Sequence, residues 1–195
     1  MTKKGSVPMP ALQPQPKSIT LEQYEALPEN IRAEVFEGIV YNMASPSEMH
    51  QTISTELTTI LNNYMKTKQN PCKVYHAPFD VKLNDDPLTI VQPDLMIICD
   101  RSKLDQNRCN GAPDFIIEIV SPGNPADDYI RKLYHYKNAG VREYWIVDAR
   151  RKTITVNYFE HDILNVPYSF DCSIKVNIFE DLYVNFAEIA EILNI

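Results

Sequence analysis

Apolar residues recur at helical spacing in the segment that follows Ser45. Ile53, Leu57 and Leu61 lie four positions apart, which places them on one face of a helix. The sequence SPSE at residues 45–48 is a helix start, with Ser45 as N-cap and a proline at the first helical position. These signals predict a helix that runs to about Lys66.

Capping residues and helix breakers predict three more helices. A short helix is expected over residues 18–27. An Asn-Pro pair at residues 124–125 opens another helix, which Gly140 closes, and Asn185 opens a last helix. The apolar residues expected to face inward from the last two helices are Ile130, Leu133, Phe186, Ile189 and Leu193.

Strand patterns fill the gaps between these helices. Residues 34–43 are typical of a hairpin that turns at Glu37-Gly38, and residues 76–83 alternate between apolar and polar side chains. Residues 94–99 and 115–120 are continuous apolar runs, which are typical of central strands covered on both faces.

Further strands at residues 144–147 and 153–159 complete the order of elements. From residue 45 onward this order is helix, three strands, helix, strand. It predicts an α/β or α+β domain with a mixed central sheet flanked by helices, an N-terminal hairpin and a C-terminal helix. Residues 1–17 are rich in proline and are expected to form a disordered tail, which leaves residues 18–195 as a single domain.

Composition and charge narrow the function classes. The chain has 195 residues and a net charge of −7, which excludes a protein that binds nucleic acid through a broad basic surface. It does not exclude an enzyme whose acidic site holds a metal ion. Because no apolar run is long enough to span a membrane and the N-terminus lacks an apolar signal core, a cytoplasmic protein is expected.

The cysteines show no metal-binding pattern. Cys72, Cys99, Cys109 and Cys172 include no CxxC pair, so a zinc site is not expected. In a cytoplasmic protein such residues are expected to be free thiols.

Two acidic residues stand where apolar residues belong. Glu118 interrupts the run FIIEIV, and Asp94 begins the run DLMII. If these strands are neighbours, the two carboxylates converge at one edge of the sheet, and an all-oxygen site of this kind suits Mg²⁺ or Mn²⁺. The alternative is structural: Asp94 caps a turn, and Glu118 pairs with an Arg or Lys of the core.

The helix that follows Glu118 offers a basic residue for the same site. Asp128 and Lys132 lie four positions apart and share a face of an ideal α-helix, which by itself indicates only a surface ion pair. However, the helix returns across the sheet directly after the Glu118 strand. An ammonium group reaching back to the carboxylates could orient a water molecule or stabilise charge on a phosphate.

Several segments of the chain resemble a family of nucleases. The pair Pro93-Asp94, followed by Glu118-Ile119-Val120, looks like the PD-(D/E)xK nuclease superfamily, and the chain as a whole resembles the Uma-type restriction endonuclease family. The matching segments are EVFEG (34–38), SPSEMH (45–50), APFDV (77–81), VQPDL (91–95), GAPDFIIEIVSP (111–122) and DYIRKLYHYKNAGVREYWIVD (128–148).

This resemblance implies a restriction-endonuclease-like core and specific roles for residues. Asp94 and Glu118, with the carbonyl of Ile119, would be metal ligands for Mg²⁺ or Mn²⁺. The superfamily usually places a catalytic Lys two residues after the Glu, where this chain has Val120. Lys132 would have to substitute for it, and its setting after Asp128 matches the Uma-type pattern.

Further residues could support the site. Glu37 resembles an acidic position of the family, although it is equally a turn residue beside Gly38. His50 falls in the first turn of the predicted helix, where it either lines the site or makes a hydrogen bond at the helix start. Asp80 lies on the polar face of its strand and could hold a metal ion through water.

The sequence thus predicts a metal-dependent endonuclease that hydrolyses DNA phosphodiester bonds. The proposed catalytic residues are Asp94, Glu118 and Lys132, and the family resemblance favours a homodimer. One alternative is a catalytically degraded nuclease fold that acts as a binding or assembly module, for which Val120 is the main argument. Another is a hydrolase of small molecules that uses the same metal site.

Overall fold

The computed structural model describes residues 18–28, 31–121 and 127–195. The tail predicted over residues 1–17 and the helix start predicted at Asn124 lie outside the described residues, as does the side chain of Asp128. No helix in the described part of the chain is long and apolar enough to cross a membrane.

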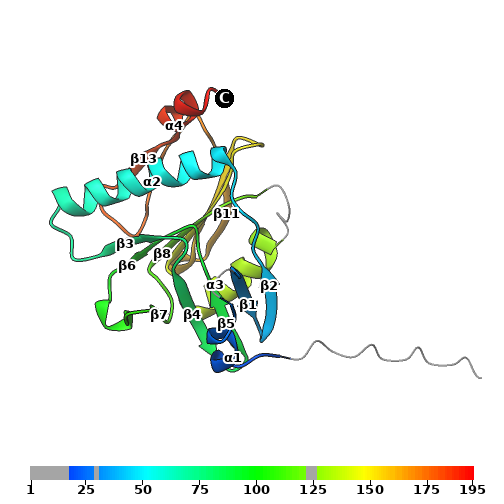
Figure 1. The fold of residues 1–195 in the computed structure, drawn as a ribbon. Coiled ribbons are helices and arrows are strands. Elements are labelled where there is room, and N and C mark those ends of the chain that lie inside the picture. Colours follow the sequence, from blue (N-terminus) through cyan, green and yellow to red (C-terminus); the bar gives the residue numbers. More distant parts are fainter. Residues whose placement is uncertain (1–17, 29–30, 122–126) are drawn as a thin grey trace, which may run out of the picture.

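A mixed six-stranded sheet forms the centre of the molecule (Figure 1). Its strand order is β11-β10-β9-β8-β6-β3; β8 and β9 run parallel, whereas all other neighbours are antiparallel. The strands are β3 (Lys73–His76), β6 (Leu95–Ile98), β8 (Phe115–Ile119), β9 (Glu143–Asp148), β10 (Thr153–Tyr158) and β11 (Ile163–Ser169).

A second sheet of five strands lies beside the first, below it in Figure 1. Its order is β2-β1-β5-β4-β7, and a further two-stranded sheet pairs β12 with β13. The strands are β1 (Ala33–Phe36), β2 (Ile39–Asn42), β4 (Asp80–Asp85), β5 (Leu88–Val91), β7 (Arg108–Asn110), β12 (Ser173–Lys175) and β13 (Tyr183–Asn185).

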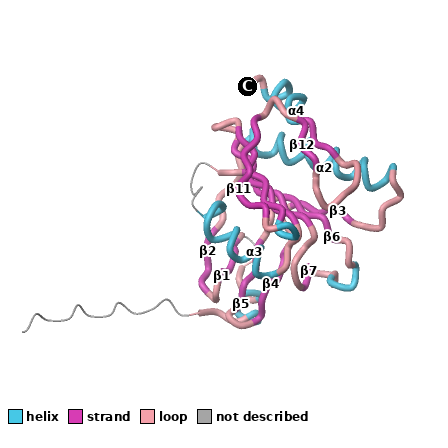
Figure 2. The backbone as a smooth tube through the Cα atoms, turned by 180° about the vertical axis from the view of Figure 1, so that it is seen from behind, coloured by secondary structure: helices cyan, strands magenta, loops and turns pink. Residues whose placement is uncertain are grey.

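The helices occupy both sides of the central sheet, as Figures 1 and 2 show from opposite directions. The long helix α2 crosses one side with α4 next to it, while α3 lies on the side of the second sheet. The helices are α1 (Leu21–Glu25), α2 (Glu48–Thr67), α3 (Leu133–Ala139) and α4 (Phe186–Leu193); short 3₁₀ turns are η1 (Arg101–Lys103) and η3 (Phe159–His161), and η2 (Asp127–Lys132) is a π-helical segment.

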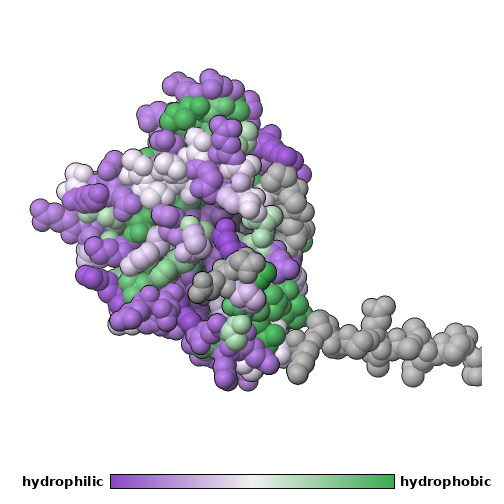
Figure 3. All heavy atoms as spheres, in the orientation of Figure 1, coloured by the Kyte–Doolittle hydropathy of each residue, from purple (hydrophilic) through white to green (hydrophobic). Residues whose placement is uncertain are grey.

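The two faces of the central strands pack into different cores. Leu95 and Ile97 of β6 join the core under α2, whereas Met96 and Ile98 join the core between the central sheet, the second sheet and α3. This alternation explains why β6 and β8 read as continuous apolar runs, since both of their faces are buried. In the view of Figure 3, hydrophilic residues cover much of the surface, and a hydrophobic patch lies at the top, where Figure 1 places α4.

The predicted order of helix, three strands, helix and strand is confirmed for α2, β3, β6, β8, α3 and β9. Strands of the second sheet are inserted along the chain, with β4 and β5 between β3 and β6 and β7 between β6 and β8. The predicted hairpin is also confirmed, because β1 and β2 pair across a turn at Glu37-Gly38. Both turn residues have positive φ, and a Cβ on Gly38 would lie 2.4 Å from the Cβ of Ser18. Only glycine fits at position 38.

The start of α2 differs from the prediction by two residues. Ser47, and not Ser45, is the N-cap, and its hydroxyl accepts a hydrogen bond from the backbone N–H of His50. Both serines precede an apolar helical repeat, so the sequence signal was the same for either. The last helix was predicted correctly, with Asn185 as its N-cap and Phe186 and Ile189 buried.

Residues 76–83 do not form one strand as predicted. They divide between β3, which ends at His76, and β4, which begins at Asp80 in the other sheet. Pro78 lies between them and has no N–H to donate to a sheet, so the ladder cannot continue through it. Apolar and polar residues continue to alternate across Pro78, so the pattern gives no sign that the chain passes from one sheet to the other.

The expectation that all the cysteines are free thiols is wrong. Cys72 and Cys99 form a disulfide across the ends of β3 and β6, with their Cα atoms 4.0 Å apart. The register pairs Lys73 with Ile98, so Cys72 and Cys99 are the next opposite pair. Their separation of 27 residues in sequence gave no sign of this register. Cys109 and Cys172 are free.

Candidate active site

The pairing of β6 with β8 brings Asp94 and Glu118 together. The antiparallel register sets Leu95 opposite Ile117, so the next opposite pair is Asp94 and Glu118. Directly opposite residues on antiparallel strands have Cβ atoms about 5 Å apart and side chains on the same face. The prediction that the two strands are neighbours is confirmed, and both carboxylates line one pocket.

Asp94 is held by contacts from two different elements. Its Oδ2 lies 3.1 Å from Nε2 of His50 and 2.8 Å from the backbone N of Ile119. Since a carboxylate only accepts, both nitrogens donate to it. Oδ1 of Asp94 has no hydrogen-bond partner among the described residues, and the same holds for the buried Nδ1 of His50. The carboxylate is thus fixed on one side and available on the other.

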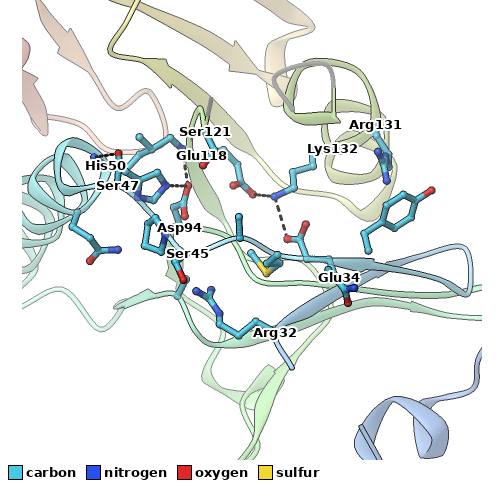
Figure 4. A pocket seen from close by; sticks show the side chains of 18 of the residues that line it. Arg32, Glu34, Ser45, Ser47, His50, Asp94, Glu118, Ser121, Arg131 and Lys132 are labelled. Atoms are coloured by element: carbon cyan, nitrogen blue, oxygen red, sulfur yellow. Dashed lines mark hydrogen bonds and ion pairs between the residues drawn. The ribbon is translucent and has the colours of Figure 1, made fainter. Parts of the chain in front are cut away.

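Lys132 reaches the site from η2. Its Nζ lies 2.9 Å from Oε1 of Glu118 and 3.1 Å from Oε1 of Glu34 (Figure 4). Lys132 is only 5% exposed, whereas Ile130 in the same segment is 72% exposed. The expectation that Ile130 faces inward is therefore wrong. The physical reason is the wider winding of a π-helix, which shifts the inward face away from the positions an α-helix would bury.

Tyr136 completes the environment of Glu118. Its hydroxyl donates a hydrogen bond of 2.6 Å to Oε1 of Glu118. Burial, together with the negative charge of Glu118, raises the pKa of Tyr136 well above its ordinary value, so this hydroxyl stays protonated. The sequence left open that Glu118 pairs with an Arg or Lys of the core. Lys132 is such a partner, and it also lines the pocket.

Sequence reasoning missed Glu34 and Tyr136, which contact Lys132 and Glu118, respectively, and also the pocket-lining Arg32 and Arg131. Glu34 lies on β1 with its side chain buried, and its Oε1 also accepts a hydrogen bond from the backbone N of Gln92 at 3.0 Å. The sequence does mark Glu34, which is an acidic residue within the apolar strand of the segment EVFEG, but the family resemblance pointed to Glu37 in the same segment. Tyr136 follows Lys132 by four residues in a helical segment, a spacing that could have found it.

Glu34, Asp94, Glu118 and Lys132 line one pocket with a volume of about 610 Å³. Figure 4 shows the carboxylates of Asp94 and Glu118 on one side of it, with Lys132 between Glu118 and Glu34. The charged residues that line the pocket are Arg32, Glu34, Asp94, Glu118, Arg131 and Lys132. The pocket thus contains both acidic and basic side chains.

Other residues singled out in the sequence lie elsewhere. Glu37 is exposed at the hairpin turn and does not line this pocket. Asp80 also lies outside the pocket lining, where Tyr24 and Gln92 donate hydrogen bonds to its Oδ1. His50 does line the pocket, and it makes a helix-start hydrogen bond as well, so both alternatives for this residue hold.

The donor set fits a magnesium-type ion better than zinc. Among the described residues, no group of three or more His, Cys, Asp or Glu side chains is placed to hold a metal, so a closed zinc site is not formed. Mg²⁺ needs fewer protein ligands, because it is commonly bound by one or two carboxylates and keeps several waters. Asp94 and Glu118 provide such a pair, and Oδ1 of Asp94 has no hydrogen-bond partner among the described residues.

Comparison with known proteins agrees with this fold. The sequence model of the family Uma2, described as "Putative restriction endonuclease", matches residues 21–179. A protein of Synechocystis sp., named "Uncharacterized protein slr1290", is 26% identical over 161 residues, which cover 80% of this chain and 78% of that protein.

A solved structure shares the fold. It is the crystal structure of a "putative nuclease belonging to DUF820" from Anabaena variabilis, with a TM-score of 0.73 and 20% sequence identity. The match covers 89% of this chain and 98% of that chain. Because the family match spans most of the sequence, from α1 to beyond β12, the chain belongs to the Uma2 family of nuclease-like proteins.

Proposed function

We propose that this protein is a metal-dependent endonuclease that hydrolyses DNA phosphodiester bonds, with Asp94, Glu118 and Lys132 as its catalytic residues. The observation that carries the proposal is the position of Lys132. Its ammonium lies 2.9 Å from Glu118 although it comes from η2 and not from β8. Lys132 therefore takes the place of the lysine that the superfamily usually has two residues after the Glu, where this chain has Val120.

In this proposal the carboxylates bind a cation and the lysine acts on the substrate. Asp94, Glu118 and the carbonyl of Ile119 would hold Mg²⁺ or Mn²⁺, which supplies a Lewis acid for a phosphoryl oxygen. Lys132 can stabilise negative charge that develops on the phosphate, because its ammonium is held in place before substrate binds. His50 fixes the orientation of Asp94 through Oδ2.

Cleavage of supercoiled plasmid DNA by the full chain tests the proposal. Wild type should convert the plasmid to nicked and linear forms with Mg²⁺ or Mn²⁺, and EDTA should stop the reaction. Asp94→Asn should abolish cleavage. Asp86→Asn is the matched control, since Asp86 is exposed on the turn between β4 and β5, and it should cleave as wild type does.

Two results would contradict the proposal. One is a folded wild-type protein that leaves plasmid and oligonucleotides intact with every divalent ion, which would instead support a binding or assembly module. The other is full activity in Asp94→Asn. Cleavage of small phosphodiesters but not of DNA would assign the same site to a different substrate.

A homodimer is part of this proposal, because two sites facing one duplex would cut both strands. Sedimentation velocity should then give twice the mass of the chain, and linear plasmid should form without prior accumulation of the nicked form. A monomer that only nicks DNA would contradict this part of the proposal alone.

A further inference from the structure

Arg32 presents a positive charge to the pocket without an acidic partner. Its Nε and Nη2 donate to the same atom, Oε1 of Gln92, at 3.4 and 3.2 Å. In the part of the chain that the structure describes, no carboxylate oxygen lies within 4.0 Å of this guanidinium. An amide oxygen orients the guanidinium but does not neutralise it, so the side chain keeps its full charge.

Gln92 is itself held in a single orientation. Its Nε2 donates to Oδ1 of Asp80 at 2.9 Å, and its backbone N donates to Glu34 at 3.0 Å. Because the Asp80 carboxylate can only accept, the amide must turn its nitrogen toward Asp80 and its oxygen toward Arg32. Asp80, which the sequence suggested as a metal residue, thus acts through Gln92 to position Arg32.

The other cations of the pocket are engaged differently. Lys132 lies between two carboxylates, and the guanidinium of Arg131 stacks 4.0 Å from the ring centroid of Tyr41. Figure 4 shows Arg32 across the pocket from Lys132, with its guanidinium directed toward Ser45. Arg32 therefore adds a positive charge on the side of the pocket across from Lys132.

We infer that Arg32 binds a phosphate of the nucleic acid strand next to the phosphate that is cleaved. This inference rests on the proposed function and adds a binding role for one residue. A guanidinium matches the geometry of phosphate oxygens, and it is already fixed before the ligand arrives, so little side-chain freedom is lost on binding. Arg32 is then a positioning residue that sets where the strand lies over Asp94 and Glu118.

The binding constant of a fluorescent DNA duplex tests this inference with the full chain. Fluorescence anisotropy with Ca²⁺ in place of Mg²⁺, over a series of salt concentrations, gives the Kd and its salt dependence. In Arg32→Gln the Kd should rise about tenfold, and equally for unrelated sequences. The slope of log K against log salt should fall by about 1, as expected for one lost phosphate contact.

Two variants accompany this measurement. Arg32→Lys keeps the positive charge but loses the planar guanidinium that Gln92 orients. Its salt slope should therefore stay near that of wild type, and its Kd should lie between those of wild type and Arg32→Gln. Arg101→Gln is the matched control: Arg101 is exposed after the end of β6 opposite to Asp94, and its Kd should not change. Thermal unfolding of each variant shows that it is folded.

Kinetics separate positioning from catalysis. Arg32→Gln should raise KM about tenfold while kcat at saturating DNA stays within about threefold of wild type. A loss confined to kcat, or an unchanged Kd and salt slope in Arg32→Gln, would overturn the inference while leaving the proposed function intact. Wild type that neither binds nor cleaves DNA would overturn both. Competition by millimolar inorganic phosphate alone, with no effect of Arg32→Gln on the DNA Kd, would show a site for free phosphate and contradict the inference.

Discussion

The position of Lys132 beside the carboxylates was predictable from the sequence, but the π-helical segment that carries it was not. Its proximity to the carboxylates was predicted from the return of the helix across the sheet, and the contact with Glu118 agrees with that expectation. The spacing of an α-helix predicts that Ile130 faces inward, whereas Ile130 is exposed. The spacing of an α-helix does not predict the inward face of a π-helical segment, because i→i+5 hydrogen bonds wind the chain more widely.

Substitution of Lys132 tests its catalytic role. Lys132→Ala should reduce the rate of DNA cleavage by roughly 10²- to 10⁴-fold, the usual effect of a positioned catalytic group. Lys132→Arg should recover little, because a planar guanidinium does not replace a compact ammonium between two carboxylates. Single-turnover cleavage measures both. Lys137→Ala is the control on the same helix, where the lysine is exposed and pairs with Asp162. Wild-type rates in Lys132→Ala would remove this residue from the mechanism.

Tyr136 should contribute to both stability and site geometry. Tyr136→Phe removes the hydroxyl that donates to Glu118 but keeps the buried ring. A hydrogen bond to a charged group contributes about 1.5–3 kcal/mol, so the free energy of unfolding should fall by about that amount. Urea denaturation measures it. Tyr134→Phe is the matched control on the same helix, with an exposed ring, and should change little. Equal stabilities for the two variants would contradict the assigned role of the Tyr136 hydroxyl.

At the scale of elements, the pairing of β6 with β8 forms the carboxylate pair, and the start of α2 supplies His50. The central strands were predictable because both faces of each are buried, which leaves an unmistakable apolar run. The second sheet was only partly predictable. Its strands β5 and β7 are short, and β4 was hidden in one alternating segment that changes sheet at Pro78.

The start of α2 gives a direct test at this scale. Ser47→Ala should lower the free energy of unfolding by about 1 kcal/mol, because the helix loses its N-cap hydrogen bond to His50. Ser45→Ala should have a smaller effect, since Ser45 precedes the cap by two residues. Chemical denaturation compares the two variants. A greater loss in Ser45→Ala would show that the helix begins where the sequence alone placed it.

At the scale of the whole molecule, the disulfide and the charge balance were the features least accessible to sequence. Cys72 and Cys99 are neighbours only because β3 and β6 pair in one particular register. Likewise, the net charge of −7 does not reveal the positive charge of Arg32 in the pocket. Arg32 precedes β1 and Asp94 precedes β6, and the two residues line one pocket only in the folded chain. The pairing of strands that are distant in the sequence brings such residues together, and the spacing of residues along the chain does not predict this pairing.

The disulfide is testable by thiol counting and stability. Under oxidising conditions the unfolded protein should show two reactive thiols, those of Cys109 and Cys172. The double variant Cys72→Ser with Cys99→Ser should be less stable by about 3.5 kcal/mol, which is the chain-entropy expectation for a loop of this length. Thermal unfolding with and without reductant measures the loss, and reductant should not affect the double variant. Four reactive thiols in oxidised wild type would contradict the disulfide.

The proposed function depends most on Asp94 and Glu118 as the residues that hold a divalent ion. The most direct measurement is a crystal structure of the full chain soaked in Mn²⁺, with diffraction data collected at the manganese absorption edge. We expect an anomalous peak in the pocket, in contact with carboxylate oxygens of both Asp94 and Glu118, and no such peak in Asp94→Asn. Wild-type crystals whose pocket shows no peak, or whose Mn²⁺ binds away from both carboxylates, would contradict the proposed metal site.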